Sequence, residues 1–254
     1  MRDLNNYYNK YIEDNFDHIL SDYRKKHIEI ELIKKIRPKT IVEIGCGINP
    51  LFLDFEDFEQ LTIIEPADGF CAFVADKLEN EYRHLKDKVK VIQKTIQDLE
   101  SLNSLPDFIM CVGLLGEIPK PIEIVDSIFR ISGPDTYVYI SAPNEFSFHR
   151  VLAKEAGLIK DLNQLSEEQI KFQRFHVFSK QTMIDMVSSA GFKVIDSGSY
   201  FIKPFTHKQM NCLIKENLID ENVILGLGRM IKYMPELGAE VYVCLKKGSS
   251  NSKM

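Results

Sequence analysis

A strand-like run that leads directly into a turn with two glycines constrains the fold of this chain more than any other feature. Residues 40–44 read Thr-Ile-Val-Glu-Ile, and Gly45 and Gly47 follow with Cys46 between them. Glycine adopts backbone angles that a Cβ forbids, so such a turn can bring main-chain N–H groups against a ligand. Because residue 50 is Pro50, the third glycine of a dinucleotide-binding fingerprint is missing, and no Gly-Lys-Ser/Thr of a P-loop follows. The turn therefore indicates a ligand site but excludes these two phosphate-binding motifs.

Strand-like and helix-like patterns alternate along the chain. The strand-like runs lie at 40–44, 61–65, 89–93, 108–112, 137–141, 192–197 and 240–245, and helical spacing occurs in 7–36, 70–85 and 122–131. Continuous apolar strands that alternate with helices are typical of a parallel sheet buried on both faces. The sequence therefore predicts an α/β fold with a mostly parallel sheet and helices on both sides.

Two segments are longer than the connections that such a fold needs. We expect an N-terminal helical cap at 1–38, one domain at 39–248 with insertions at 144–179 and 201–238, and a disordered tail at 249–254. Long connections in a compact domain are usually lids or binding elements. We therefore expect the helical insertions to form a substrate lid, although the second could equally cover a sheet edge or form a homodimer contact.

Charge and cysteine usage narrow the class of protein. The net charge of -5 and the lack of a concentrated basic stripe argue against a dedicated nucleic-acid binder. The five cysteines are odd in number, lie far apart and form no CxxC pair, which disfavours a disulfide framework or a zinc site. No apolar run approaches the roughly 20 residues that span a bilayer. A cytoplasmic protein without nucleic-acid, membrane or metal partners is the expectation.

The second strand-like run ends on an acid that fits a nucleoside. In an open parallel sheet the ligand binds beyond the carboxyl ends of the strands. Glu65 stands at such an end, followed by Pro66, about twenty residues after the glycine turn. A carboxylate at this place can accept hydrogen bonds from both ribose hydroxyls. The glycine turn and Glu65 together predict a nucleoside-containing ligand.

The pattern E-x-G-x-G, formed by Glu43, Gly45 and Gly47, resembles motif I of the class I S-adenosylmethionine (SAM) dependent methyltransferases. The resemblance covers roughly residues 23–199 and the last strand-like run. It implies a seven-stranded sheet whose last strand is antiparallel, SAM as cofactor and S-adenosylhomocysteine as product. A similar turn also occurs in α/β proteins without a cofactor, and the acid at the second strand end favours the methyltransferase interpretation.

The resemblance also implies which residues contact SAM. Glu43 would anchor the glycine turn and reach the SAM ammonium, and Arg24 is the candidate to close over the methionine end. Thr95 stands where the family usually has an acid that accepts from the adenine amino group, and this departure leaves Gln97 as an alternative. The expected cofactor contacts are Arg24, Glu43, Gly45, Cys46, Gly47, Glu65, Pro66, Thr95, Ile96, Gln97, Cys111 and Val112.

Methyl transfer to a hydroxyl needs a base close to the reacting atoms. Glu117, His149 and His176 qualify by their positions after the fourth and fifth strand-like runs, and Glu117 stands where the family often has a His. A His at 176 would more often be a structural donor than the base. These three residues are the catalytic candidates.

Four polar residues are the candidates for binding the acceptor substrate: Asn144, Arg150, Arg174 and Lys203. The two arginines and the lysine fit phosphate or pyrophosphate recognition, which suits a nucleotide-linked acceptor. Each of the three could instead be a solvated surface charge. Asn144 and Glu145 alone do not make a metal-binding cluster, so no metal is expected.

The leading hypothesis is a small-molecule methyltransferase. It would methylate a hydroxyl, or as the second choice an amine, of a sugar-derived or nucleotide-activated precursor, for example in the biosynthesis of a bacterial surface polysaccharide such as a capsule. One alternative is a SAM-binding scaffold or sensor without catalysis. Another is a methyltransferase for protein or RNA, which the acidic balance and the absence of a Pro-Pro-Tyr motif at 113–116 disfavour.

Overall fold

Seven strands form one mixed sheet in the computed structural model, which describes residues 15–165, 170 and 174–248. The strands are β1 (Thr40–Ile44), β2 (Gln60–Ile64), β3 (Val89–Ile92), β4 (Phe108–Val112), β5 (Tyr137–Pro143), β6 (Phe192–Tyr200) and β7 (Glu240–Lys247). Their order is β3-β2-β1-β4-β5-β7-β6, and β7 runs antiparallel to both of its neighbours. The predicted fold class, including the antiparallel last strand, is confirmed.

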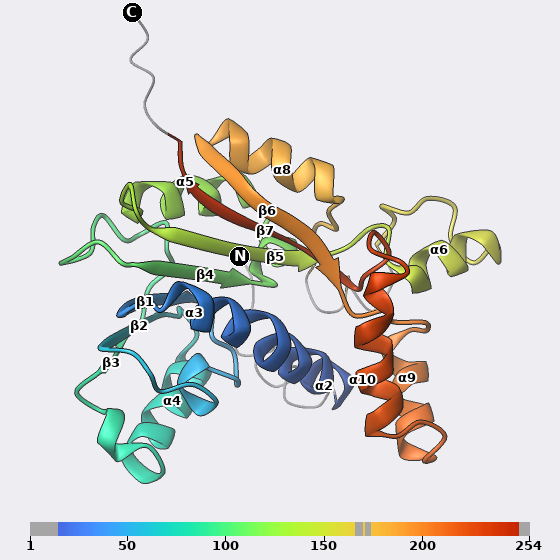
Figure 1. Ribbon diagram of the computed structural model, residues 1–254, viewed down its shortest axis with the longest axis horizontal. Helices are drawn as coiled ribbons and strands as arrows, with labels where there is room; N and C mark the ends of the chain where they lie inside the picture. Colours follow the sequence, from blue (N-terminus) through green and yellow to red (C-terminus); the bar gives the residue numbers. More distant parts are fainter. Residues whose placement is uncertain (1–14, 166–169, 171–173, 249–254) are drawn as a thin grey trace, which may run out of the picture.

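Helices cover both faces of the sheet (Figure 1). The helices in the described part of the chain are α2 (Asn15–Arg24), the π-helical turn η1 (Lys25–Glu29), α3 (Ile30–Ile36), α4 (Asp68–Asn80), α5 (Pro121–Ile131), α6 (Phe148–Glu155), α8 (Lys180–Ser189), α9 (His207–Lys215) and α10 (Glu221–Arg229). Of these, α6, α9 and α10 lie beyond one end of the strands. Short 3-10 turns are η2 (Leu51–Leu53), η3 (Arg83–Leu85), η4 (Leu114–Glu117) and η5 (Met230–Lys232). The apolar faces of α5 and α8 pack on one side of the sheet, and those of α3 and α4 pack on the other.

Several boundaries differ from those that the sequence predicts. β6 continues to Tyr200, beyond the predicted end at 197, because its pairing with β7 carries the strand outward past a bulge at Val194/Asp196. α4 begins at Asp68 rather than at 70, where an acid in the first turn favours the helix N-terminus. It ends at Asn80, and a separate 3-10 turn follows in place of the predicted helix end at 85.

The N-terminal region that the structure describes is one continuous helical run with a wide turn inside it. The π-helical turn η1 joins α2 to α3 and buries Lys25 and Glu29. A π-turn adds one residue to a helical turn and often occurs at functional sites. Here it places two charged side chains on the inner side of the helix, which the helical spacing in the sequence does not predict.

The second insertion packs against the N-terminal helix. Phe16 and Leu20 of α2 share an apolar cluster with Phe201 and with Met210 of α9, and Tyr23 lies edge-on to Phe201 with ring centroids 5.1 Å apart. Figure 1 shows α9 and α10 beside the outer end of α2. The insertion and the cap are therefore joined by a small core of their own.

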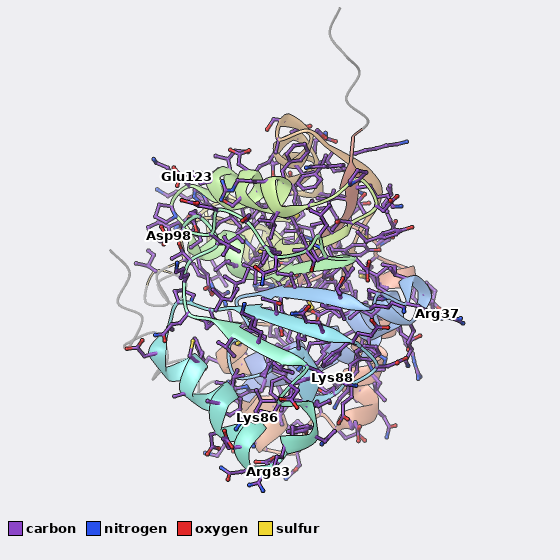
Figure 2. All side chains as sticks on the ribbon, turned by 90° about the vertical axis from the view of Figure 1, so that its left-hand side faces the viewer. Arg37, Arg83, Lys86, Lys88, Asp98 and Glu123 are labelled. Atoms are coloured by element: carbon purple, nitrogen blue, oxygen red, sulfur yellow. The ribbon has the colours of Figure 1, made fainter. Side chains whose placement is uncertain are left out.

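Parts of the expected domain organisation lie outside the described residues: the first fourteen residues of the cap, positions 166–169 and 171–173 of the first insertion, and the tail at 249–254. Charged side chains of both signs, among them Arg37, Arg83, Asp98 and Glu123, lie on the outside of the fold (Figure 2). Within the described ranges, no helix has the length and apolar character needed to cross a bilayer.

Candidate functional site

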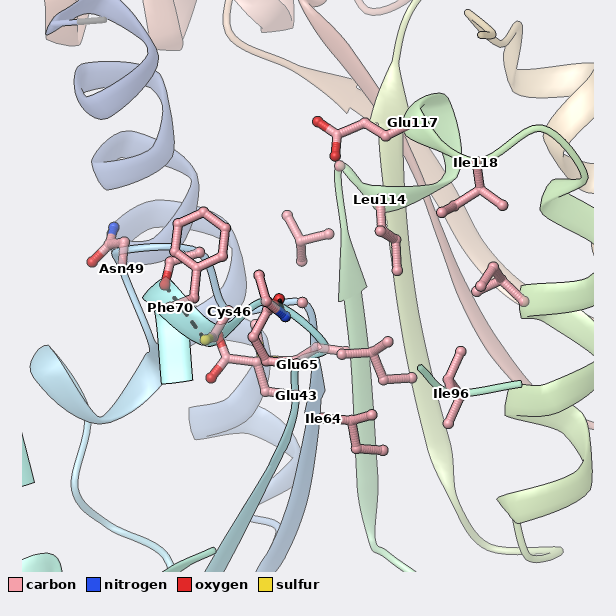
Figure 3. A pocket seen from close by; sticks show the side chains of 18 of the residues that line it. Glu43, Cys46, Asn49, Ile64, Glu65, Phe70, Ile96, Leu114, Glu117 and Ile118 are labelled. Atoms are coloured by element: carbon pink, nitrogen blue, oxygen red, sulfur yellow. Dashed lines mark hydrogen bonds between the residues drawn. The ribbon is translucent and has the colours of Figure 1, made fainter. Parts of the chain in front are cut away.

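A cavity of about 310 Å³ opens where the carboxyl ends of the parallel strands meet. Its walls come from the segments that follow β1, β2, β3 and β4, from α2 and η1, and from the first residue of β7. We call it the donor cavity; Figure 3 shows its lining side chains. The carboxyl edge of a parallel sheet is where such folds bind ligands, so the cavity is the natural candidate site.

The glycine turn forms one wall of the donor cavity. Gly45 and Gly47 have φ angles of 76° and 55°, which favour glycine. The Gly45 N–H donates to the Ile64 carbonyl at 2.9 Å and so extends the pairing of β1 with β2 beyond the strand. A Cβ on Gly45 would meet Leu114 only at 3.9 Å. The backbone angle, rather than crowding by a neighbour, therefore requires glycine here.

Glu43 anchors the segment that follows this turn and also lines the donor cavity. Its Oε2 accepts a hydrogen bond from the Leu51 N–H at 3.0 Å. Burial raises the pKa of Glu43 to about 7, although the Leu51 N–H and Lys25 favour the charged form. The Glu43 carboxylate can therefore both anchor the turn and contact a ligand, as the sequence predicts.

Lys25 holds the loop that follows the glycine turn. Its ammonium donates to the Pro50 carbonyl at 2.9 Å, contacts Asn49 Oδ1 and lies 3.3 Å from Asp54 Oδ2. Burial lowers the pKa of Lys25, while Glu43 and Asp54 act in the opposite direction. The buried lysine of the π-turn thus ties the N-terminal helix to the glycine turn.

The acid at the end of β2 faces the donor cavity. Glu65 is only 5% exposed, and its Oε1 accepts from the Ala67 N–H at 2.9 Å. This bond orients the carboxylate toward the cavity side of the turn, where Pro66 also lies. A fixed acid beside a glycine turn fits the two hydroxyls of a ribose.

The segment after β3 lines the cavity end expected to hold adenine, and Thr95, Ile96 and Gln97 all contribute. The Thr95 hydroxyl donates to Asp98 Oδ2 at 2.5 Å and accepts from the Asp98 N–H at 3.4 Å. The hydroxyl hydrogen is therefore directed away from the cavity, and the side-chain oxygen is available there only as an acceptor.

Apolar side chains that the sequence did not single out also line the donor cavity. They are Ile64, Phe70, Leu114, Ile118 and Ile124. Apolar walls with a few convergent polar groups are typical of cofactor sites. Phe70 could have been predicted as a lining residue, because it lies in the first turn of the helix that follows Glu65.

Arg24 also lines the donor cavity and lies between two carboxylates. Its Nε donates to Glu29 Oε1 at 2.8 Å, and its Nη1 lies 3.5 Å from Glu240 Oε1. Glu240 also accepts hydrogen bonds from the Ser141 hydroxyl at 3.2 Å and from the Tyr200 hydroxyl. Burial raises the pKa of Glu29, and the neighbouring Arg24 opposes that shift. Sequence reasoning missed Glu29 and Glu240, since neither belongs to a recognisable motif.

Eleven of the twelve predicted cofactor contacts line the donor cavity; Cys111 does not. Its side chain is fully buried in the core on the α5 and α8 side of the sheet, and burial raises its pKa to about 12. Alternation along β4 explains the difference, because Met110 and Val112 point to the other face. Both of these neighbours line the cavity.

The three catalytic candidates lie in three different surroundings. Glu117 is 8% exposed in η4 and lines the donor cavity, at the end of β4 (Figure 3). His176 Nε2 lies 3.1 Å from the Pro119 carbonyl, and the His176 N–H donates to the Gly116 carbonyl. His176 therefore braces the η4 turn and does not line the cavity. His149 lies in a second, smaller cavity.

This second cavity of about 40 Å³ adjoins the donor cavity, and we call it the side cavity. It is lined by Leu20, Pro143, Asn144, Ser147, His149, Arg150, Arg174, Val177, Lys203, His207, Ala239 and Glu240. Leu20, Pro143, Arg174 and Glu240 line both cavities. The structure thus places all four predicted substrate residues around one space, together with His149 and with His207, which sequence reasoning missed.

Two of these four residues also hold the local backbone. Asn144 donates to the carbonyls of Glu236 at 2.9 Å and Gly238 at 2.8 Å. Arg150 donates through Nε to the Leu162 carbonyl at 2.9 Å and through Nη2 to the Gln164 carbonyl at 2.5 Å. Direct substrate contact by either residue remains a prediction. Among the described residues, no three His, Cys, Asp or Glu side chains come together as a metal site would need.

Comparisons with known proteins agree with this fold. A family model described as a methyltransferase domain matches residues 13–197. A search of curated proteins found no significant match.

Solved structures show the same fold at low sequence identity. One is a SAM-dependent methyltransferase, described as a possible histamine N-methyltransferase, from Thermotoga maritima (TM-score 0.56, 15% identity, 93% of this chain and 98% of that chain). Another is the N-methyltransferase NodS from Bradyrhizobium japonicum in complex with S-adenosylhomocysteine (0.50, 10%, 89% and 90%). A third is the O-methyltransferase segment of StiE (0.50, 12%, 87% and 74%).

The family match covers most of the chain, and the donor cavity brings the glycine turn and the Glu65 carboxylate together with apolar walls. The chain therefore belongs to the methyltransferase domain family, and its cofactor is SAM.

Proposed function

We propose that the protein transfers the methyl group of SAM to a hydroxyl of a small sugar-derived or nucleotide-activated precursor, with an amine as the second choice. The observation that carries this proposal is the shared wall between the donor cavity and the side cavity. Part of a small acceptor can lie in the side cavity while the rest of it reaches the donor cavity past Arg174 and Glu240. A role in bacterial surface-polysaccharide biosynthesis is part of the proposal.

The contribution of the chain is to hold the two reactants in line and to keep water away. Bound SAM supplies an electrophilic methyl group on a sulfonium, and the C–S bond breaks as the C–O bond forms. The acceptor hydroxyl loses its proton in this step, and a base must take it. Glu117 is the predicted base that lines the donor cavity, so we assign this proton to its carboxylate.

One structural relative is described with a small acceptor, histamine, which supports a small acceptor here, and the three relatives together do not choose its atom. One is described as an N-methyltransferase, another as a possible N-methyltransferase, and the third as an O-methyltransferase. With an amine acceptor the same geometry would serve, because the amine nitrogen would attack and Glu117 would take a proton from it.

Glu117→Gln tests the assignment of the base. The variant should bind SAM with unchanged affinity by calorimetry, whereas S-adenosylhomocysteine release with nucleotide-sugar acceptors should fall about 10²–10⁴-fold, the range for loss of a general base. Glu123→Gln, an exposed acid on α5 paired with Lys120, is the matched control and should leave both quantities unchanged.

The outcomes separate the candidate functions. Unchanged turnover in Glu117→Gln would remove this residue as the base. SAM binding without turnover on any small acceptor would favour the scaffold or sensor, and methyl transfer only to protein or RNA would favour the macromolecular alternative. Absence of SAM binding would overturn the proposal as a whole.

A further inference from the structure

Lys25 holds the segment that follows the glycine turn from inside the fold. Its side chain lines the donor cavity, and the residue is only 2% exposed, although a lysine is rarely buried unless it is paired. We propose that Lys25 is a positioning residue for SAM: it holds the peptide group between Pro50 and Leu51 and thereby keeps the Glu43 carboxylate ready for the ammonium of SAM. This inference concerns the donor site and goes beyond the proposed function, because it is independent of the acceptor.

One loop takes up the donors of the Lys25 ammonium. A lysine ammonium has three N–H donors and no acceptor. The three acceptors here are Asn49 Oδ1, the Pro50 carbonyl at 2.9 Å and Asp54 Oδ2 at 3.3 Å. All of them belong to residues 49–54. Lys25 is therefore committed to this loop, which gives it a positioning role rather than direct contact with SAM.

A single peptide group connects Lys25 with Glu43. The Pro50 carbonyl accepts from Lys25 at 2.9 Å, and the Leu51 N–H donates to Glu43 Oε2 at 3.0 Å. This carbonyl and this N–H belong to the same planar peptide unit. A cation at the carbonyl oxygen polarises the unit, so its N–H becomes a stronger donor to the carboxylate. Loss of Lys25 would therefore affect both the place and the charge of Glu43.

The electrostatic environment of the two side chains agrees with this connection. Burial raises the pKa of Glu43 to about 7, and Glu29 and Glu65 raise it further, whereas the Leu51 N–H and Lys25 lower it. Burial lowers the pKa of Lys25, and Glu43 is the group that opposes this shift most. Each of the two therefore stabilises the charged form of the other.

Two other ionisable groups act on this pair. Asp54 contacts Lys25 from the loop, and its charge favours the charged lysine. Cys46 lies in the glycine turn and interacts with Glu43; burial raises the pKa of its thiol well above the usual value, so the thiol is neutral near pH 7. The change of charge at this wall of the donor cavity near neutral pH is therefore that of Glu43.

The same loop is also bound to the helix that precedes Lys25. Asn49 donates through Nδ2 to Asp22 Oδ1 at 3.2 Å and to Ser21 Oγ at 3.3 Å, and Figure 3 shows it beside this helix. The N-terminal helix and the loop after the glycine turn are thus joined directly. A cavity wall held in this way loses little conformational freedom when a ligand binds, which favours affinity.

The test is a calorimetric titration with S-adenosylhomocysteine at pH values on both sides of the Glu43 pKa of about 7. This product carries the ammonium of SAM without the sulfonium charge, so its own ionisation lies at higher pH and interferes less. Lys25→Met removes the cation but keeps a side chain of similar length. The pH at which affinity rises should shift upward by about one unit or more, so affinity on the acidic side should fall about tenfold or more.

Matched variants separate this role from a merely structural one. Lys34→Met removes the same charge from an exposed pair with Glu31 and should leave the pH profile unchanged. Lys25→Arg keeps the charge and should keep the profile. In a Glu43→Gln background, Lys25→Met should lower affinity by one factor at every pH, because the ionising partner is absent. This double variant leaves neither charge of the pair unpaired, so it provides the test if Lys25→Met alone does not fold.

Several results would overturn the inference. One is a Lys25→Met profile equal to that of wild type, and another is a deficit of the same size at every pH, which a loosened fold alone would produce. A third is equal affinity of Glu43→Gln with and without Lys25→Met. If Glu43→Gln and wild type share one profile, Glu43 does not contact the ammonium, and the inference falls with that contact. The melting temperature of each variant shows whether it is folded.

Failure of this inference can be told apart from failure of the proposed function. No acceptor takes part in these titrations, so each of the results above leaves the proposed methyl transfer in place. If wild type does not bind S-adenosylhomocysteine at all, the proposed function is overturned together with the inference.

Discussion

At the scale of single residues, Glu65 combines features that make it the most informative side chain of the donor site. It follows a buried strand, it is almost inaccessible, and the Ala67 N–H fixes one of its oxygens. A preorganised carboxylate loses little side-chain freedom when a ligand binds. Its contribution to affinity should therefore be large for one residue.

Replacing Glu65 with Gln should weaken SAM binding about 10–100-fold, because a hydrogen bond to a charged group contributes about 1.5–3 kcal/mol. Calorimetric titration of SAM measures this change. Glu59→Gln alters an exposed acid just before β2, paired with Lys39, and should bind SAM normally. Equal affinity of wild type and Glu65→Gln would show that this carboxylate does not contact the ligand.

Glu43 predicts a pH dependence of stability. Its pKa in the folded protein, about 7, lies above the ordinary value of 4.5. Between these values the folded protein holds a proton that the unfolded chain has lost, so the free energy of unfolding should fall as pH rises. The slope from Glu43 should reach at most about 1.4 kcal/mol per pH unit. Urea unfolding at several pH values should show it in wild type and not in Glu43→Gln.

The same ionisation should act on ligand affinity in the opposite direction. Raising the pH through about 7 charges Glu43, and the charged carboxylate attracts the ammonium of SAM. The SAM affinity of wild type should therefore rise more steeply with pH than that of Glu43→Gln. The ionisation of SAM itself is common to both proteins, so identical slopes would exclude a contact with Glu43.

Residues of the site were predictable from the sequence where a local motif carries them. Glu43, Gly45 and Glu65 stand at fixed distances from a strand end, and strand ends can be recognised from apolar runs. Glu240 and His207 could not be found in this way, because only tertiary folding brings residues so distant in sequence to the site. The side chain of Cys111 does not line the donor cavity for a local reason, since the side chains of a strand alternate between its two faces.

At the scale of elements, the glycine turn shows how backbone conformation determines function. Gly45 has a positive φ, and the space beside it is open enough for a methyl group. Strain from a side chain would therefore come from the backbone angle alone. This separates the turn from sites where glycine is needed for close packing.

Gly45→Ala should lower the free energy of unfolding by about 1–2 kcal/mol, the cost of a left-handed angle for a residue with a Cβ, and it should weaken SAM binding. Gly226→Ala is the opposite case, because Gly226 lies within helix α10 with open space around it. That variant should gain up to about 1 kcal/mol. Urea unfolding measures both, and equal effects of the two changes would contradict this account of the turn.

The strands and most helices were predictable because their apolar patterns have clear periods. The π-turn η1 was not, since one additional residue in a helical turn changes the spacing too little to be recognised in a short window. The strand β6 was predicted too short for a different reason. Its outer residues are held by pairing with β7, and the two that precede the buried Tyr200, Gly198 and Ser199, are only partly buried. The end of the strand therefore lacks an apolar pattern of its own.

At the scale of the whole molecule, one buried polar network joins segments from both ends of the chain. Arg24 of the N-terminal helix contacts Glu29 and Glu240, and Glu240 bonds with Ser141 of β5 and Tyr200 of β6. The network lies at the wall of both cavities. Its integrity should therefore affect global stability as well as the shape of the site.

Arg24→Met should lower the free energy of unfolding by about 3 kcal/mol near neutral pH, because it leaves two buried carboxylates without this cation. The deficit should shrink at lower pH, where Glu29, whose pKa burial already raises, becomes protonated. Arg83→Met removes an exposed arginine from η3 and should have almost no effect (Figure 2). Thermal unfolding at two pH values measures the deficit of Arg24→Met. A deficit that is the same at both pH values would contradict the prediction.

The overall architecture followed from the alternation of strands and helices and from the family resemblance, but the arrangement of the insertions did not. The residues that place α9 and α10 against α2 are ordinary apolar side chains such as Phe16, Phe201 and Met210. Their local sequence pattern does not indicate which element they pack against. Leu20 and His207, which belong to these packed helices, line the side cavity beside the four predicted substrate residues, and the sequence did not predict either of them.

The position of β7 in the sheet has a consequence for how the protein is made. β7 is the last strand along the chain, yet it lies between β5 and β6. During synthesis, which proceeds from the N-terminus at about 5–20 residues per second, β1 to β5 can pair as soon as they leave the ribosome. β6 must wait, because in the described sheet its only neighbour is β7. Glu240, the first residue of β7, arrives with that strand, so the wall between the two cavities can form only after β7 has left the ribosome.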